Sequence, residues 1–403
     1  MIYKCPNCNG ALEFNPLTEQ LECSHCGNGY SIQQLENDSP NKGSKNRQKR
    51  ETDKIQSKEP ETMECQIYTC TSCGGELMVS DAEVSTYCAY CGQPTIVFSR
   101  ISNELKPDNI IPFKISKEQA VEGIRERLKK GFFVPREIKN FEVEKVRGIY
   151  VPYWLYNIHY YDKQIVAATN KKSSLAGPFY IYEAEAEYNK VLLDASKQLN
   201  DETSMKLEPY DLRLLKEFKP AYMSGFYADR ADQKGDEHKR RAALRVKTMF
   251  DEEAREDVSF SIGPFGYIVK SEPRFQIKNE KYALLPAWFL TFRYKNEPYT
   301  MLVNGQTGKI VGSVPLDKKK VLGLATLIAI ISSGAFYFAW HFIFTGLKWY
   351  GPAFWGIILL IMLVIVVNFY VIGIRIITGY KKNISLTRSK QTEQYVRERQ
   401  DET

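Results

Sequence analysis

The alternation of apolar and polar positions is clearest in two aromatic segments. The segments "PYWLYNIHY" (152–160) and "PAWFLTFRY" (286–294) both fit the pattern P-x-W-[LF]-x-x-[IF]-x-Y. Alternate side chains of a strand point to the same side, so each segment predicts a strand with one aromatic face. The residues that share these faces are Trp154, Tyr156, Ile158 and Tyr160, and Trp288, Leu290, Phe292 and Tyr294. We interpret the segments as equivalent core strands; an aromatic ligand site is the alternative.

A helical period appears in residues 116–131, "SKEQAVEGIRERLKKG". Ser116 and Gln119 stand at the spacing of a capping box, and the run ends at Gly131, so the segment predicts an amphipathic helix. Its apolar face is formed by Val121, Ile124 and Leu128.

The charged stretch 237–255 also predicts a helix. Residues 299–314, "YTMLVNGQTGKIVGSV", predict a hairpin, because two apolar runs flank an Asn-Gly turn. Together with the aromatic strands, these elements predict a soluble α+β domain with a largely antiparallel sheet over 101–316.

Two long apolar runs follow, at 321–345 and 353–377. Each exceeds the roughly 20 apolar residues that a helix needs to cross a bilayer, so they predict a two-helix transmembrane hairpin over 317–380. His341 lies in the first run, and its role stays open.

Lysine and arginine flank this predicted hairpin on the side of both termini. The residues concerned are Lys318, Lys319, Lys320, Arg375, Lys381 and Lys382. The positive-inside rule then predicts a multi-pass membrane protein with both termini in the cytoplasm, and membrane lipids as partners.

The cysteines are arranged in two repeats of one pattern. "CPNCNGALEFNPLTEQLECSHC" (5–26) and "CTSCGGELMVSDAEVSTYCAYC" (70–91) each hold two C-x-x-C pairs separated by 14 residues. The chain has nine cysteines and no export signal at its start, which favours thiolates that bind metal over disulfides. The predicted ligands are Cys5, Cys8, Cys23 and Cys26 in the first repeat, and Cys70, Cys73, Cys88 and Cys91 in the second.

Four cysteines suit a tetrahedral zinc ion, one in each repeat, and leave no open position for catalysis. A rubredoxin-like iron site uses the same four thiolates and is the alternative. The repeats therefore predict two small, β-rich zinc ribbons that metal binding stabilises. We expect His25 to be a bystander and Cys65 to be a free thiol.

Composition indicates a linker between the two ribbons and gives no sign of nucleic-acid binding by itself. The chain has 403 residues and a net charge of +7, which is too small to indicate nucleic-acid binding by itself. Residues 36–64 are polar and predict a flexible tether with a mild basic cluster. The predicted organisation is multi-domain: ribbon 1–35, tether 36–64, ribbon 65–100, α+β domain 101–316, transmembrane hairpin 317–380 and cytoplasmic tail 381–403.

No catalytic constellation follows from the sequence. "NGQTGKI" lacks the first glycine and the Ser/Thr of a P-loop, and "YMSGF" lacks the first glycine of a nucleophile elbow. We therefore expect a protein that is not an enzyme and has no organic cofactor.

Several segments resemble one family. The ribbons, "IIPFKISKEQA", "GIYVPYWLYN", "LEPYDLRLLKEFKPAYMSGFYA" and "LLPAWFLTFRYKNEPYTMLVNGQTGKIVG" are similar to bacterial membrane proteins with TFIIB-type zinc ribbons. Members are often labelled primosomal or helicase-like, and some relatives are associated with PspA- and SPFH-type membrane complexes. The resemblance implies a bacterial cell-membrane protein whose ribbon cysteines hold metal and whose partners are membrane or cytoplasmic proteins.

Two functions remain in view. The first is a membrane-anchored adaptor or scaffold that presents protein-binding surfaces, in an envelope-stress or membrane-organising complex. The second is a membrane-tethered nucleic-acid-binding protein that uses the ribbons. The second ribbon carries Glu76, Asp81 and Glu83 and no Lys or Arg between 69 and 95, which favours the adaptor because acidic groups repel phosphate.

Overall fold

The computed structural model describes most of the chain between residues 3 and 341. The described residues are 3–38, 61–79, 88, 90, 96–139, 145–168, 179–262 without 198 and 200, 265–312 without 296, 317, 319–324, 326, 332, 334, 337, 338, 340 and 341. They belong to two compact units. The first comprises 1–120, 146–289 and 303–309, and the second comprises 121–145, 290–302 and 310–403.

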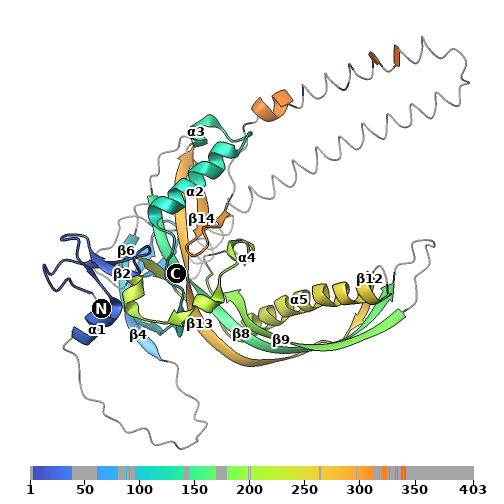
Figure 1. Ribbon diagram of the computed structural model, residues 1–403, viewed down its shortest axis with the longest axis horizontal. Coiled ribbons are helices and arrows are strands. Elements are labelled where there is room, and N and C mark those ends of the chain that lie inside the picture. The colour runs from blue at the N-terminus through green and yellow to red at the C-terminus, as the bar shows by residue number, and fades with distance from the viewer. Residues whose placement is uncertain are drawn as a thin grey trace, which may run out of the picture. The chain divides into compact units, whose positions relative to one another are not determined.

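The first unit begins with a three-stranded antiparallel sheet and a short helix (Figure 1). The elements are β1 (Leu12–Asn15), β2 (Gln20–Cys23), β3 (Gly29–Tyr30) and α1 (Ile32–Asp38). Phe14 of β1 stands opposite Leu21 of β2, and both side chains are buried. The hairpin of β1 and β2 between the first two cysteine pairs agrees with the β-rich ribbon that the first repeat predicts. We call residues 3–38 the first ribbon.

A twelve-stranded sheet dominates the rest of the structure. Its order is β10-β7-β13-β8-β11-β5-β4-β6, with β9 and β12 paired to β8, and β14 paired to β13 and β15. The bounds are β4 (Thr62–Cys70), β5 (Glu76–Val79), β6 (Ile96–Leu105), β7 (Asn109–Ile110), β8 (Lys145–Ala168), β9 (Phe179–Asp194), β10 (Lys216–Glu217), β11 (Tyr227–Asp229), β12 (Phe265–Ser271), β13 (Arg274–Tyr294), β14 (Glu297–Asn304) and β15 (Ile310–Val311). Most pairs are antiparallel, whereas β11–β8 and β13–β7 are parallel.

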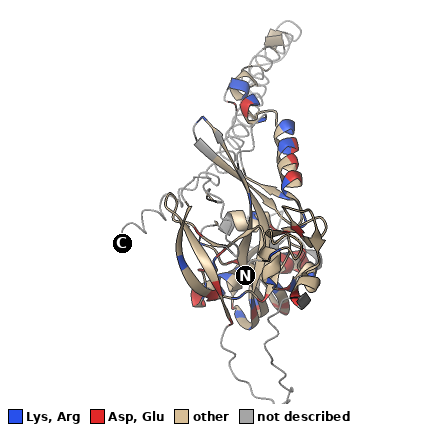
Figure 2. Cartoon of the chain, turned by 90° about the vertical axis from the view of Figure 1, so that its left-hand side faces the viewer, with Lys and Arg blue, Asp and Glu red and all other residues tan. Residues whose placement is uncertain are grey.

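The helices and turns between these strands are α2 (Lys117–Lys130), α3 (Arg136–Lys139), α4 (Asp201–Leu207), η1 (Leu212–Leu214), η2 (Pro220–Met223) and α5 (Asp236–Ile262). The capping box of α2 is confirmed: the Gln119 amide donates to Ser116 Oγ at 3.2 Å, and the Ser116 amide donates to Gln119 Oε1 at 2.9 Å. Basic and acidic residues are mixed along α2 (Figure 2). The predicted helix at 237–255 corresponds to α5, and the predicted hairpin at 299–314 corresponds to β14 and β15.

The two aromatic segments form buried parts of β8 and β13, as predicted. Strands β8 and β9 are long and curved, and α5 lies against their concave side (Figure 1). Tyr156, Ile158 and Tyr160 of β8 form a core with Val246 and Phe250 of α5. A helix with an apolar stripe thereby covers the aromatic face of the sheet.

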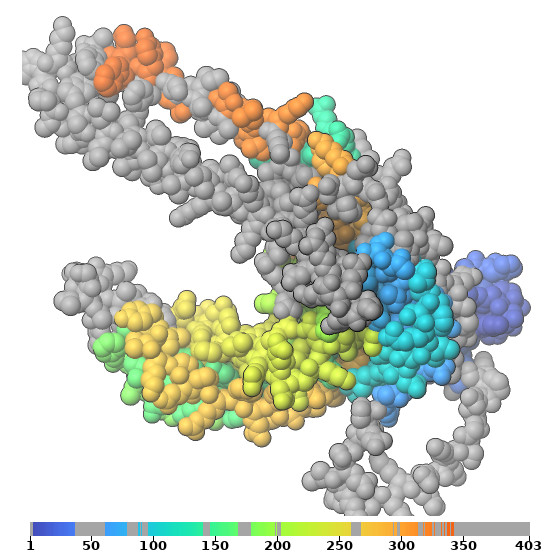
Figure 3. All heavy atoms as spheres, turned by 180° about the vertical axis from the view of Figure 1, so that it is seen from behind, coloured from blue at the N-terminus to red at the C-terminus, as the bar shows by residue number. Residues whose placement is uncertain are grey.

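The second cysteine repeat is not a separate small domain, which corrects the predicted fold class. Its strands β4 and β5 belong to the large sheet, where β4 pairs with β6 and β5 pairs with β11. Residues of β4 and β6 lie side by side on the molecular surface (Figure 3). The spacing of the cysteines predicted a β-rich module, but it carries no information about the strands of the large sheet with which that module pairs.

The predicted transmembrane hairpin over 317–380 also requires correction. Among the described residues, no helix is long and apolar enough to cross a membrane. Apolar length alone predicted the spans, whereas a span requires an apolar segment that is also helical over its whole length. The predicted multi-pass location is therefore wrong on this finding. The second predicted span, 353–377, and the tail 381–403 lie outside the described residues.

Candidate metal centres

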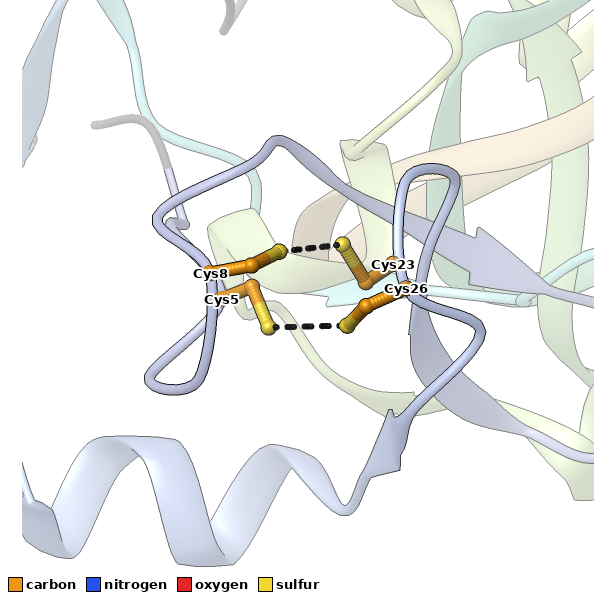
Figure 4. Close-up of side chains that lie close together, drawn as sticks. All are labelled: Cys5, Cys8, Cys23 and Cys26. Carbon is orange, nitrogen blue, oxygen red and sulfur yellow. Dashed lines mark hydrogen bonds between the residues drawn. The ribbon is translucent and has the colours of Figure 1, made fainter.

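The first centre is formed where two loops of the first ribbon bring four cysteines together. Cys5 and Cys8 come from the loop before β1, Cys23 ends β2, and Cys26 lies in the loop after β2 (Figure 4). All four sulfur atoms lie within 4.8 Å of one another. The predicted ligands of this repeat are thus assembled by the fold.

Three of the cysteine loops have the same backbone geometry. The amide of the first cysteine donates to the carbonyl five residues later: Cys5 to Gly10 at 2.8 Å, Cys23 to Asn28 at 2.9 Å, and Cys70 to Gly75 at 2.9 Å. The amide four residues after each first cysteine donates back to that cysteine's carbonyl, at 2.8, 2.9 and 2.8 Å. The residue at this fourth position has a positive φ: Asn9 at 61°, Gly27 at 73° and Gly74 at 67°. Positive φ favours glycine and asparagine, which explains the residues found there.

The sulfur spacing fits a tetrahedral metal ion. Cys5 Sγ and Cys26 Sγ are 3.6 Å apart, and Cys8 Sγ and Cys23 Sγ are 3.4 Å apart. Four sulfurs at about 2.3 Å from a zinc ion stand about 3.8 Å from one another, whereas a disulfide needs about 2.05 Å. The four thiols are therefore arranged as ligands, and a tetrahedral sulfur set suits zinc or iron.

The surroundings of the first centre favour thiolate at Cys5 and Cys23. Burial raises the pKa of Cys5, but the Tyr30 hydroxyl at 3.5 Å and the Cys8 and Asn7 amides lower this pKa to about 6. The Cys26 amide lowers the pKa of Cys23, and burial opposes this effect. At Cys8 the Gly10 amide lowers the pKa, but the neighbouring Cys23 thiol and burial oppose this and raise the pKa to about 12. Thiolate is the form that binds metal, so Cys5 and Cys23 are the ligands that deprotonate most readily.

Replacement of Tyr30 by phenylalanine is expected to weaken metal binding at the first centre. The variant removes the hydroxyl that donates to Cys5 Sγ, and loss of such an outer-sphere hydrogen bond costs about 10- to 100-fold in metal affinity. Competition with a chromophoric zinc chelator should show this loss for one of two metal equivalents. Tyr161→Phe is the matched control, because its hydroxyl donates to Glu183. Equal zinc affinities in both variants would contradict a role for Tyr30.

The second centre lies at one end of the large sheet. Cys70 ends β4, Cys73 follows in the turn before β5, and Cys88 is the third cysteine of the cluster; each is at most 3% exposed. The sulfurs of this set lie within 4.8 Å of one another, and Cys73 Sγ and Cys88 Sγ are 3.7 Å apart. The fourth predicted ligand, Cys91, lies outside the described residues.

The other singled-out residues fall outside these two clusters. His25 is exposed and does not belong to the first set. Cys65 is buried in β4, where its thiol donates to the Ser102 carbonyl at 3.6 Å. Burial raises the pKa of Cys65 to about 11, which disfavours thiolate chemistry. The His341 ring lies 6.2 Å from the Tyr337 ring.

Two glycines beside the sulfurs were missed by the sequence reasoning. A Cβ on Gly10 would lie 3.2 Å from Cys23 Sγ, and a Cβ on Gly75 would lie 3.0 Å from the Tyr90 ring and 3.4 Å from Cys73 Sγ. Both glycines stand five residues after the first cysteine of their repeat. The shared pattern C-x-x-C-x-G carried this signal, since a Cβ at this position would crowd the cysteine side chains or Tyr90.

A buried carboxyl lies beyond the second centre. Asp229 of β11 is 3% exposed and accepts a hydrogen bond from the Ser196 hydroxyl. Burial raises the pKa of Asp229 to about 7, although Ser196, Tyr90 and the Arg230 amide lower it. β11 pairs with β5, so this group lies in the sheet region that carries the second centre.

Replacement of Asp229 by asparagine is expected to change how stability depends on pH. A carboxyl with a raised folded-state pKa stabilises the fold below the unfolded pKa, and this contribution is lost as pH rises through about 7. Between pH 5 and 8 the wild type should lose on the order of 2 kcal/mol that Asp229→Asn does not lose.

Urea unfolding of both chains at several pH values measures this difference. Asp211→Asn is the control, because Arg213 holds the pKa of Asp211 at about 2, so its charge is constant over this range. A difference between Asp229→Asn and wild type that does not vary with pH would contradict the prediction.

Comparison with known proteins gives one relationship. No protein-family model and no solved structure matches the chain. The chain is 30% identical over 348 residues to the uncharacterised protein YdjG of Bacillus subtilis (strain 168), an alignment that covers 83% of this chain and 95% of YdjG. The likeness thus covers most of this chain and nearly the whole of YdjG, and the chain belongs to the same family as YdjG.

Proposed function

We propose that the protein is a non-catalytic adaptor, in which two structural zinc ions hold surfaces that bind other proteins. The first zinc is held by Cys5, Cys8, Cys23 and Cys26, and the second by Cys70, Cys73, Cys88 and Cys91. The observation that carries the proposal is the closed thiolate set of the first centre, with sulfur pairs 3.4 and 3.6 Å apart. Four cysteines fill the coordination sphere and leave no place for a reacting water.

The charges around the second centre support protein binding over nucleic-acid binding. Arg100 and Arg230 lie near this centre, but both contact the Glu76 carboxylate, Arg100 at 3.2 Å. Arg230 also contacts Glu104 at 3.1 Å. Phosphate contacts need available basic groups, and these two are already paired. Glu76 therefore does not repel phosphate as the sequence suggested, because arginines from outside the repeat neutralise its charge.

The discriminating experiment is a salt titration of nucleic-acid binding by the full zinc-loaded chain. Anisotropy with labelled single-stranded DNA, duplex DNA and RNA should show no tight binding at physiological salt. Submicromolar binding that weakens steeply with salt, and that is lost in Cys5→Ser/Cys8→Ser, would replace the adaptor by a nucleic-acid-binding function. Cys65→Ser is the matched control, because this cysteine belongs to neither cluster.

A second experiment captures protein partners with three chains: wild type, Cys65→Ser and Cys5→Ser/Cys8→Ser. Proteins that co-purify with the wild type and with Cys65→Ser, but not with Cys5→Ser/Cys8→Ser, are expected for a zinc-dependent adaptor. Identical sets of co-purifying proteins for all three chains would contradict a role of the first ribbon in partner binding.

A further inference from the structure

The first ribbon lies on a strip of basic and aromatic residues in its own chain. We call Lys216, Lys219, Tyr222, Ser224 and Gly225 the docking strip; they lie in and around β10 and η2. Two lysines of the strip meet two glutamates of the ribbon: Lys216 contacts Glu19 at 2.7 Å, and Lys219 contacts Glu36 at 2.6 Å. The strip is thus positively charged where the ribbon is negatively charged.

Aromatic and backbone contacts complete the docking. The Phe14 and Tyr222 rings meet edge to face at 5.5 Å, and the Phe14 amide donates to the Ser224 carbonyl at 3.0 Å. Gly225 has φ +84°, and a Cβ there would lie 3.2 Å from Glu13 Cβ. Glycine therefore suits this position, because its positive φ disfavours other residues and a Cβ would crowd the Glu13 side chain. The strip therefore contacts an aromatic residue, an extended backbone segment and acidic groups.

The strip is held in place by the core of the first unit. The Tyr150 hydroxyl donates to the Tyr222 carbonyl at 3.0 Å, and Phe226, directly after the strip, stacks on Phe113 at 4.2 Å. The ribbon, by contrast, is a small three-stranded sheet whose fold depends on its cysteine cluster. The core thus holds the docking strip in place, whereas the fold of the ribbon that lies on the strip depends on metal.

We propose that the docking strip is a binding site for an acidic, aromatic-containing segment of a partner protein, and that the metal-loaded first ribbon covers this site. The proposal rests on the proposed function, because it needs a metal-stabilised ribbon. The ribbon's contacts indicate the partner's chemistry: an aromatic residue on an extended backbone, followed by a carboxylate. Side chains of both ion pairs are 33–44% exposed, so water weakens them and a competing segment is able to displace the ribbon.

A labelled peptide tests the site on the full chain. The probe is a fluorescein-tagged peptide with the sequence of residues 11–21, which contains Phe14 and Glu19. The chain variant Glu19→Lys/Glu36→Lys keeps all four cysteines of the first centre but places like charges against the strip. Anisotropy should show at least tenfold tighter peptide binding to this variant than to the zinc-loaded wild type.

Two controls define the site. Adding Lys216→Glu/Lys219→Glu to this variant restores opposite charges between the ribbon and the strip but repels the acidic peptide, so peptide binding should fall at least tenfold. A peptide in which alanine replaces the phenylalanine and lysine replaces the second glutamate should not bind. Equal peptide affinity for wild type and Glu19→Lys/Glu36→Lys, or binding that ignores the strip lysines, would overturn the proposal.

Metal dependence is tested with Cys5→Ser/Cys8→Ser, which removes ligands of the first centre only. This chain should bind the peptide at least tenfold more tightly than wild type, and its metal content should fall from two ions to one. A wild-type chain without metal at the first centre would defeat the proposed function itself. A loaded wild type, with peptide affinity unchanged in both variants, would defeat the covering role alone.

Discussion

Replacement of Cys70 and Cys73 by serine is expected to destabilise the first unit far more than replacement of Cys5 and Cys8. The second centre is continuous with the large sheet, because Cys70 ends β4, and β4 pairs with β6 along nine residue positions from Thr62 to Cys70. Structural zinc contributes an apparent 10–16 kcal/mol in zinc-finger peptides, roughly the whole stability of a domain, about 5–15 kcal/mol. The variant should be insoluble or should melt more than about 10 °C below wild type.

Cys65→Ser is the matched control for this experiment. It changes a buried thiol of the same strand, and serine can still donate to the Ser102 carbonyl. Calorimetry of the three chains should therefore rank Cys65→Ser and Cys5→Ser/Cys8→Ser close to wild type and Cys70→Ser/Cys73→Ser far below. A Cys70→Ser/Cys73→Ser chain that melts with Cys65→Ser would show that the second centre does not stabilise the sheet.

Replacement of Phe113 by alanine is expected to have the second large effect. Phe113 is fully buried and contacts three rings: Phe226 at 4.2 Å, Trp288 at 4.9 Å and Tyr150 at 5.0 Å. Truncation of a buried phenylalanine costs about 3–5 kcal/mol. Because Phe226 follows the docking strip, the variant should also increase hydrogen exchange in residues 220–226.

Denaturant unfolding and hydrogen exchange by mass spectrometry measure these two effects. Phe113→Leu should lose clearly less stability, since leucine fills part of the space between the rings. Phe132→Ala is a further control, because the Phe132 side chain is 66% exposed. A Phe113→Ala chain as stable as Phe132→Ala would contradict the role given to this aromatic cluster.

An element could be predicted from the sequence where residues close to one another along the chain determine it. The capping box at Ser116 starts α2, and the alternation from Trp154 to Tyr160 forms a buried part of β8. Cysteine spacing likewise predicted that Cys5, Cys8, Cys23 and Cys26 lie together, because a C-x-x-C loop closes through its own backbone hydrogen bonds.

Other features depend on partners that are distant in the sequence. The second cysteine repeat carried no sign that β5 would pair with β11. Similarly, nothing in the ribbon's own sequence indicated that Glu19 and Glu36 would meet Lys216 and Lys219. Such contacts are set by the tertiary fold, which a local sequence pattern does not show.

The central claim, two closed thiolate metal centres, is tested most directly by X-ray absorption at the metal edge of the purified full chain. The account predicts zinc with a single shell of four sulfur neighbours at about 2.3 Å. A shell of nitrogen or oxygen neighbours at about 2.0–2.1 Å would contradict it, because at least one centre would then hold its ion without the fourth cysteine.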